Sequence, residues 1–315
     1  MLQTRWHEGR AIHGPLMWLG LASVVAALVT TALMVVDGRM VSGAPVWHKP
    51  FKFFVSSVLY AWTLTWYVGR LSGARRVVAW WAGTVTAVAL AIELVLITMQ
   101  AARGVGSHFN VATPFDAAVF NAMGVFILTL SLMLAAIWIL LVRERDGHTV
   151  FRTAARWGAA VTLLGLGVGG LMVQPTDRQR AESRQGVRPL LSGGHAVGVA
   201  DGGPGLPLLN WSTDGGDLRV AHFVGLHALQ ALPLLAWALV RTRRWSEAVV
   251  RRVLAVIGSG YTAVVLVALH QAQRGQPLLA PDAATLLWLA LIVGIGAPVL
   301  LALLLVRTPR RAAPR

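Results

Sequence analysis

The sequence predicts an all-helical, polytopic membrane protein with eight transmembrane helices in two repeated four-helix halves. Composition, periodic apolar runs and a repeated motif lead to this prediction. Of the 315 residues, 56% are hydrophobic and only 13% are charged, and the mean hydropathy is +0.63. A soluble domain carries about 25% charged residues. The chain has no cysteine, which excludes disulfides, thiolate metal sites and cysteine nucleophiles.

Eight apolar runs have lengths close to the roughly 20 residues that a helix needs to cross a bilayer. In order they are 15–36, 51–69, 78–99, 115–142, 157–173, 220–240, 250–270 and 284–306. The first run has no convincing small-residue cleavage site after it and is longer than the apolar region of a signal peptide, so we interpret it as a membrane helix. The fifth is the shortest and is rich in glycine, including Gly165, Gly167, Gly169 and Gly170, which favour close packing between helices.

The distribution of arginine and lysine predicts the orientation of the helices. The segments 1–14, 70–77, 143–156, 241–252 and 307–315 lie on one side of the predicted membrane and contain 18 of the 28 Lys and Arg residues. The positive-inside rule therefore places both termini in the cytoplasm of a bacterial-type inner (plasma) membrane. The net charge of +15 is mostly this topology signal. No basic patch interleaved with aromatic residues indicates a nucleic-acid partner.

The opposite, outer side carries the long loops, and the longest of them is 174–219. Its second part, 192–217, contains eight glycines interleaved with apolar residues. Long loops in compact proteins are usually functional or disordered. The apolar residues favour a packed cap, which we expect to cover a site in the helix bundle.

A short motif occurs at the outer ends of the third and seventh predicted helices. Met99-Gln-Ala-Ala-Arg-Gly104 and His270-Gln-Ala-Gln-Arg-Gly275 are 171 residues apart, and a proline and an aspartate follow each of them. The motif indicates two halves, 1–150 and 151–315, the second including the loop 174–219. Because each half has four helices, both have the same orientation and are related by an axis along the membrane normal.

This architecture resembles the heme A synthase family. The similarity rests on eight helices in two halves, a Gln-x-x-x-Gly motif after helices three and seven, and a histidine, His222, that opens helix six. The resemblance implies a heme-binding scaffold. Helix two begins Lys49-Pro-Phe-Lys52 instead of supplying a histidine, helix four carries Asn121, helix eight has no histidine and the cysteine pairs are absent. These departures argue against heme A synthesis itself.

Ionisable groups inside a membrane helix are costly, so each is a candidate for function. Glu93 precedes Gln100 by seven residues, about 10 Å along a helix, and His227 lies at a similar depth in helix six. We expect this carboxylate and imidazole to form a catalytic pair. The alternative is that Glu93 is simply protonated or hydrogen-bonded within the bundle.

Further candidates belong to a cofactor or metal site at the outer side. His222 and His227 are about 140° apart around one helix, which prevents them from binding one metal ion easily together. His222, His270 and Gln230 are candidates for cofactor binding, and His195, His222, His227 and His270 for metal binding. The cofactor would be a heme or a transition metal, with His195 or Asp201 contributed by the cap.

The only two lysines of the chain, Lys49 and Lys52, stand together at one membrane entry. With Arg103 and Arg274 they are candidates to bind a lipid phosphate, a heme propionate or another carboxylate. The alternative for the lysines is snorkelling towards the membrane surface.

Three functional hypotheses follow. The first is a heme- or metal-binding redox or cofactor-processing protein. The second is a metal-free binding or transport protein for a lipid or small anion, and the third is a membrane-embedded metal-dependent hydrolase or transferase. Membrane lipids and a small-molecule or lipid-like ligand are the expected partners. The sequence contains no phosphate-binding loop, dinucleotide fingerprint or Gly-x-Ser-x-Gly motif.

The predicted topology can be tested with single cysteines, because the chain has none of its own. A cysteine in place of Arg180 should react with an impermeant reagent from outside the cell, and one in place of Arg311 only after the membrane is opened. The reverse pattern would contradict the assignment of the two sides.

Overall fold

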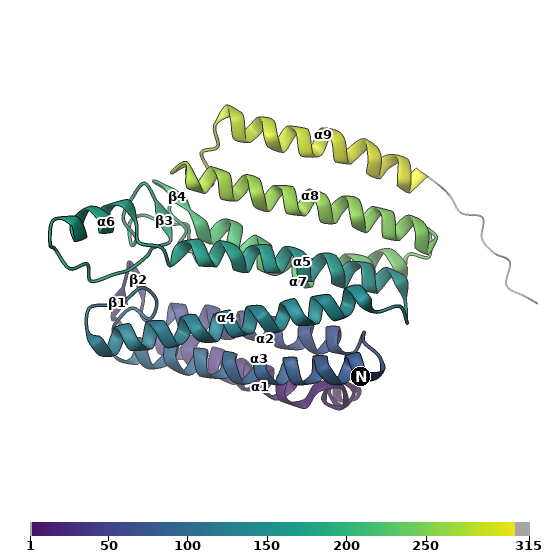
Figure 1. The fold of residues 1–315 in the computed structure, drawn as a ribbon, viewed down its shortest axis with the longest axis horizontal. Coiled ribbons are helices and arrows are strands. Elements are labelled where there is room, and N and C mark those ends of the chain that lie inside the picture. The colour runs from purple at the N-terminus through teal and green to yellow at the C-terminus, as the bar shows by residue number, and fades with distance from the viewer. Residues whose placement is uncertain (1, 306–315) are drawn as a thin grey trace, which may run out of the picture.

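The protein, represented by a computed structural model that describes residues 2–305, with side chains from residue 7, is a bundle of long helices (Figure 1). The long helices are α1 (Leu2–Val36), α2 (His48–Val68), α3 (Gly73–Ala102), α4 (Pro114–Arg143), α5 (Thr149–Met172), α7 (Leu218–Arg241), α8 (Glu247–Gln273) and α9 (Ala283–Leu305). A short helix, α6 (Asp177–Arg184), lies in the long loop. Two small antiparallel ribbons pair β1 (Met40–Val41) with β2 (Ala44–Pro45) and β3 (Ala196–Val197) with β4 (Gly216–Asp217).

Each of the eight predicted runs corresponds to one long helix. The second and fifth runs extend one residue past the ends of α2 and α5, and the last residue of the eighth run, 306, lies outside the described residues. Within the described residues, seven of these helices are long and apolar enough to cross a membrane, and α2 is not among them. With 21 residues, α2 is about 31 Å long, which is enough for a crossing. Its two lysines and its serines and threonines lower its hydropathy. The count of eight spans therefore remains a prediction for α2.

The two ends of the described chain lie at the same end of the bundle, and α6 and the β ribbons lie at the other (Figure 1). This arrangement agrees with an even number of passes. We call the end with α6 the cap end and the other the terminal end.

The same helices are neighbours in the two halves. In the first half, α1 packs on α2 and α3, α2 on α3, and α3 on α4; in the second, α5 packs on α7 and α8, α7 on α8, and α8 on α9. Contacts of α4 with α5 and of α2 with α7 join the halves. A superposition of 1–150 on 151–315 remains a prediction.

The repeated motif has the same local structure in both halves. Gly104 and Gly275 follow α3 and α8 with positive φ angles of 73° and 72°. The arginine before each glycine pairs with the aspartate at the next helix, Arg103 with Asp116 at 2.6 Å and Arg274 with Asp282 at 2.7 Å. The motif is thus a helix stop with an ion-paired turn.

Glycine brings α5 and α7 into close contact. A Cβ added to Gly165 would lie 2.8 Å from the backbone nitrogen of Leu226, and one added to Gly225 would lie 2.7 Å from the Cα of Gly165. Thr162 donates a hydrogen bond to the Leu226 carbonyl across the same contact, at 3.2 Å. At Gly165, the glycine-rich fifth run therefore serves helix packing, as the sequence indicated.

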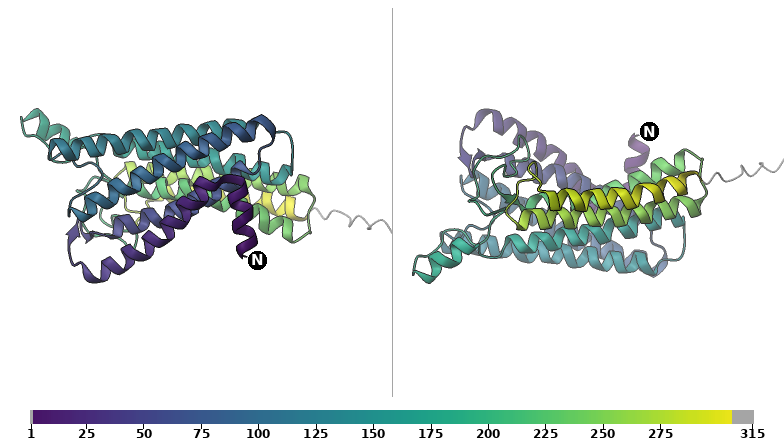
Figure 2. Two further views of the ribbon diagram at one scale, coloured as in Figure 1. Left: turned by 90° about the horizontal axis from the view of Figure 1, so that it is seen from below. Right: turned by 90° about the horizontal axis from the view of Figure 1, so that it is seen from above.

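Helix α1 is kinked at His13, where φ is −156° and ψ is 91°. The backbone N–H of Leu16 donates to Nδ1 of His13, and Nε2 lies 2.8 Å from the carbonyl oxygen of Trp80 in α3. His13 therefore starts the main part of α1 and fixes it to α3. The segment before it turns away from the bundle (Figure 2).

The positive φ angles predict equal effects of alanine at the two helix stops. Gly104→Ala and Gly275→Ala should each lower the free energy of unfolding by about 1 kcal/mol, because a Cβ disfavours this left-handed conformation. Thermal melting of the purified protein in detergent would measure the change. Gly167→Ala is the control, since Gly167 is helical and nothing lies within 4 Å of its added Cβ. Unchanged melting of both stop variants would contradict the shared role.

Candidate functional site

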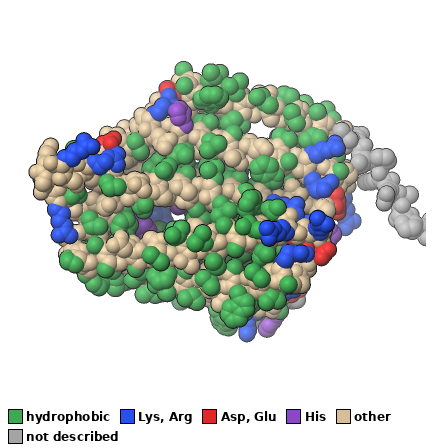
Figure 3. Space-filling view, viewed as in Figure 1, with side chains coloured by type: hydrophobic (Ala, Val, Ile, Leu, Met, Phe, Trp, Pro, Cys, Tyr) green, Lys and Arg blue, Asp and Glu red, His purple; other side chains and the backbone are tan. Residues whose placement is uncertain are grey.

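A cluster of polar side chains lies at the cap end, where the two halves face each other. Lys49 comes from the start of α2, Glu93 from α3, His108 from the α3–α4 loop, His195 from the cap and His222 from α7. Burial holds the pKa of His108 well below its usual value, and the nearby Lys49, His195 and His222 lower it further. Figure 3 shows histidine side chains in a hollow between the two layers of helices.

Glu93 is completely buried and neither of its carboxylate oxygens has a hydrogen-bond partner among the described residues. Its nearest ionisable neighbour is His108, whose Nε2 lies 3.6 Å from Oε1 of Glu93. A polar group buried in this way is costly without a partner. The structure thus places a different histidine beside Glu93 from the predicted His227.

His108 was not among the site residues that the sequence indicated. The turn after α3 folds back over the bundle because Gly104 adopts a positive φ of 73° and Phe109 one of 66°. Ser107 Oγ lies 3.1 Å from Nδ1 of His108, and the imidazole ring centre lies 5.7 Å from that of Phe53. The signal available in the sequence was the glycine-rich turn 104–106, which allows a loop to approach helix ends closely.

The cap contributes His195, which is held by Asp201. Nδ1 of His195 lies 2.9 Å from Oδ2 of Asp201, and the carboxylate also accepts the backbone N–H groups of His195 and Ala196. Burial raises the pKa of Asp201, but the hydrogen bonds and charge of His195 outweigh it and bring the value to about 2. Burial lowers the pKa of His195 in spite of Asp201. Nδ1 of His195 therefore carries a proton and donates it to the ionised carboxylate of Asp201.

His222 is fixed by the close contact of α5 and α7. Its Nδ1 lies 2.8 Å from the carbonyl oxygen of Gly165, so this nitrogen carries the proton and donates it. Gly169 leaves room for the ring, since an added Cβ would lie 3.1 Å from Cε1 of His222. Nε2 has no hydrogen-bond partner among the described residues and keeps its lone pair.

The histidines of the cluster share one arrangement. Each has its Nδ1 beside a protein oxygen: that of Ser107 for His108, of Asp201 for His195 and of Gly165 for His222. Such contacts orient an imidazole and increase the basicity of its other nitrogen. Within residues 2–305, however, no three His, Asp or Glu side chains are grouped closely enough to hold a metal ion.

The remaining predicted histidines lie elsewhere. His227 and Gln230 occupy another face of α7, with Nδ1 of His227 3.3 Å from the Gln230 side-chain oxygen and the Phe223 ring centre 4.2 Å from that of His227. Trp211 of the cap packs on Phe223 there. His270 is exposed at the end of α8. The structure does not bring these three residues to Glu93.

The predicted anion-binding cations differ in their surroundings. Lys52 donates to the carbonyl oxygen of Leu209 in the cap at 3.3 Å. Arg103 and Arg274 are engaged by the aspartates of their helix stops. The amine of Lys49 makes no hydrogen bond or ion pair to another described residue, and its Nζ lies 5.9 Å from the Phe53 ring centre.

No family model, curated protein or solved structure matches the chain in comparisons with known proteins. The site is therefore interpreted from its own geometry.

The His195–Asp201 pair predicts a cap that loosens in acid. An aspartate in the unfolded chain has a pKa near 3.9, whereas that of Asp201 in the folded cap is about 2. The stability that Asp201 contributes to the folded cap is therefore fully present above pH 3.9 and is lost as the pH falls towards 2. The pKa of His195 is lower in the folded cap than in the unfolded chain, where a histidine is protonated below about pH 6.5. Protonation of His195 in acid therefore also favours the unfolded cap.

Replacing the carboxylate should loosen the cap at neutral pH. Asp201→Asn weakens the acceptor of three donors of His195 and Ala196, and roughly tenfold faster amide hydrogen exchange is expected over 192–217. Asp214→Asn, at an exposed position of the same loop, is the control. Equal exchange in both variants would show that Asp201 does not hold the cap.

Proposed function

We propose that this chain is a heme-binding membrane protein with a redox or cofactor-processing role, and that the polar cluster at the cap end is its cofactor site. The observation that carries the proposal is His222. Its Nδ1 is tied to the Gly165 carbonyl at 2.8 Å, which leaves a basic Nε2 on a ring whose position is fixed by two packed helices. Imidazoles that bind metals usually have such a second contact.

The other residues of the cluster fit the same group. A heme requires one or two axial ligands, so the absence of a three-ligand group among residues 2–305 does not conflict with it. His222 would be a ligand of the heme iron, and His108 or His195 is available as a further ligand. Lys49, which has no hydrogen-bond partner among the described residues, would bind a propionate. Heme iron would supply a one-electron redox centre.

We also propose that the helices cross a bacterial inner membrane with the terminal end in the cytoplasm. The basic residues of the inner segments support this orientation. The cluster then faces the outside beneath the cap, where a ligand or electron partner could reach it without crossing the bilayer.

A visible absorption spectrum tests the proposed cofactor. Protein purified from a heme-sufficient bacterial host, or reconstituted with hemin, should show a Soret band and about one heme per chain. His222→Ala should lower the heme content at least tenfold, because a fixed ligand is lost. His270→Ala, at an exposed position, is the control. A wild-type protein that takes up no heme, or a His222→Ala variant that keeps it, would refute the proposal.

A second candidate function is metal-free binding of a small anion or lipid-like carboxylate, favoured by the unpartnered amine of Lys49 beside Glu93. A sample without heme whose bound organic ligand is lost in Lys49→Gln would support this alternative. Lys52→Gln is the matched control, since the Lys52 amine already has a backbone partner in the cap.

A further inference from the structure

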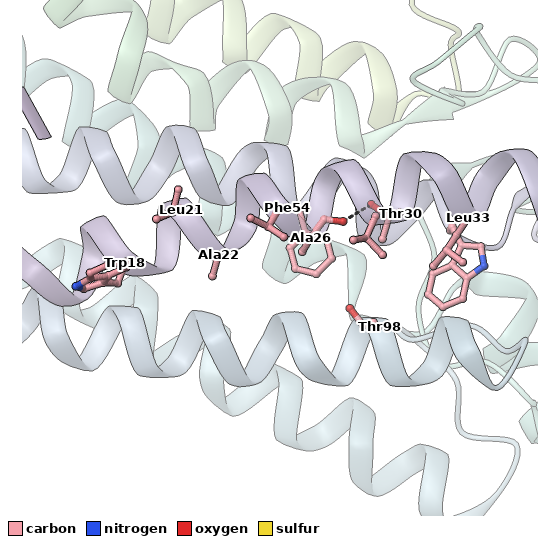
Figure 4. A pocket seen from close by; sticks show the side chains of 11 residues that line it. Trp18, Leu21, Ala22, Ala26, Thr30, Leu33, Phe54 and Thr98 are labelled. Atoms are coloured by element: carbon pink, nitrogen blue, oxygen red, sulfur yellow. Dashed lines mark hydrogen bonds between the residues drawn. The ribbon is translucent and has the colours of Figure 1, made fainter. Parts of the chain in front are cut away.

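An apolar groove runs along the first half of the protein, between α1, α2 and α3, with a cavity volume of about 660 Å³ (Figure 4). Most of its lining comes from one face of α1, which includes Trp18, Ala22 and Leu33. Phe54 of α2 and Thr98 of α3 form the other sides.

The side chains that line the groove need no hydrogen-bond partner from a ligand. Its two hydroxyl groups are satisfied by their own helices: Thr30 donates to the Ala26 carbonyl at 2.9 Å, and Thr98 donates to the Leu94 carbonyl at 2.7 Å. The occupant is therefore hydrocarbon.

The shape of the groove fits a chain parallel to the helices. From Trp18 to Leu33 the lining follows α1 for 15 residues, which is about 22 Å at 1.5 Å per residue. This is most of the roughly 30 Å hydrocarbon thickness of a bilayer. An acyl chain in a membrane has this direction.

A cation without an ion-pair partner among the described residues stands at one end of the groove. The guanidinium of Arg10 lies 5.2 Å from the ring centre of Trp18, at the terminal end, and is exposed. The kink at His13 places it there, because the segment before the kink turns away from the axis of α1. Arg10 makes no ion pair with another described residue. At an interface, such a cation attracts anionic head groups.

At the other end of the groove the charge is balanced. Trp47 donates from Nε1 to Asp37 at 2.7 Å, and the same carboxylate is paired with Arg39 at 2.7 Å. An anionic head group therefore has its partner at the Arg10 end.

We propose that this groove is a binding site for an anionic phospholipid of the leaflet at the terminal end, with the phosphate at Arg10 and one acyl chain along α1. This site is separate from the polar cluster and does not depend on a heme. The lipid covers apolar surface that α1 and α3 leave open.

Native mass spectrometry of the detergent-purified protein, titrated with phosphatidylglycerol or phosphatidylcholine, tests the site. One phosphatidylglycerol should remain bound to the wild type under conditions that remove phosphatidylcholine. Arg10→Gln should weaken its binding about fivefold, the effect of one interfacial cation. Ala22→Trp should displace the chain by filling the groove.

Two control variants match these changes. Arg251→Gln removes another exposed arginine at the terminal end, and Ala290→Trp adds an indole to the exposed surface of α9. Both should bind lipid as the wild type does, and melting curves identify any unfolded variant. The proposal is overturned if phosphatidylcholine binds equally well, if Arg10→Gln behaves like its control, or if the groove is occupied by a second copy, seen as a dimer lost in Ala22→Trp.

Discussion

The backbone contact between α5 and α7 at Gly165 and Gly225 is the constraint on which the second half depends. It allows the Gly165 carbonyl to accept from His222 at 2.8 Å and Thr162 to donate across the helix pair. One turn further along the same contact, the Leu229 carbonyl of α7 accepts a hydrogen bond from the hydroxyl of Tyr67 in α2 at 3.0 Å, which ties the two halves together. A side chain larger than hydrogen at either glycine would separate the helices and move His222 away from its acceptor.

Near this contact, at the cap end, lie polar groups that find no hydrogen-bond partner within the helix bundle itself. Asp201 stabilises the cap by accepting hydrogen bonds from three donors of His195 and Ala196. Below it, Glu93 and Lys49 remain without hydrogen bonds among the described residues. A carboxyl and an amine that are held near each other at low dielectric without hydrogen-bond partners are typical of places where a ligand completes the structure.

The sequence predicted the helices well because their signal is local. Apolar length located each of the eight long helices, and the Gln-x-x-Arg-Gly motif identified two turns whose φ angles and ion pairs agree. The site was predicted only in part. Glu93, His195, His222 and Lys49 lie in one cluster, but His108 takes the place expected for His227. Which face of α7 turns inward depends on the glycine contact with α5, and the path of the turn at 104–109 depends on Phe109; neither follows from periodicity.

The first helix of each half limits the size of the residues where it packs closely on its neighbours. Along α5, Gly158 and Gly165 meet side-chain or backbone atoms of α2 and α7 within 3 Å of an added Cβ, so residue size there is restricted. Along α1, Gly20 is restricted in the same way, since an added Cβ would lie 2.1 Å from the Trp62 ring of α2, whereas Ala22 borders an open groove. A larger side chain is therefore tolerated on the groove side of α1 but not at its contact with Trp62.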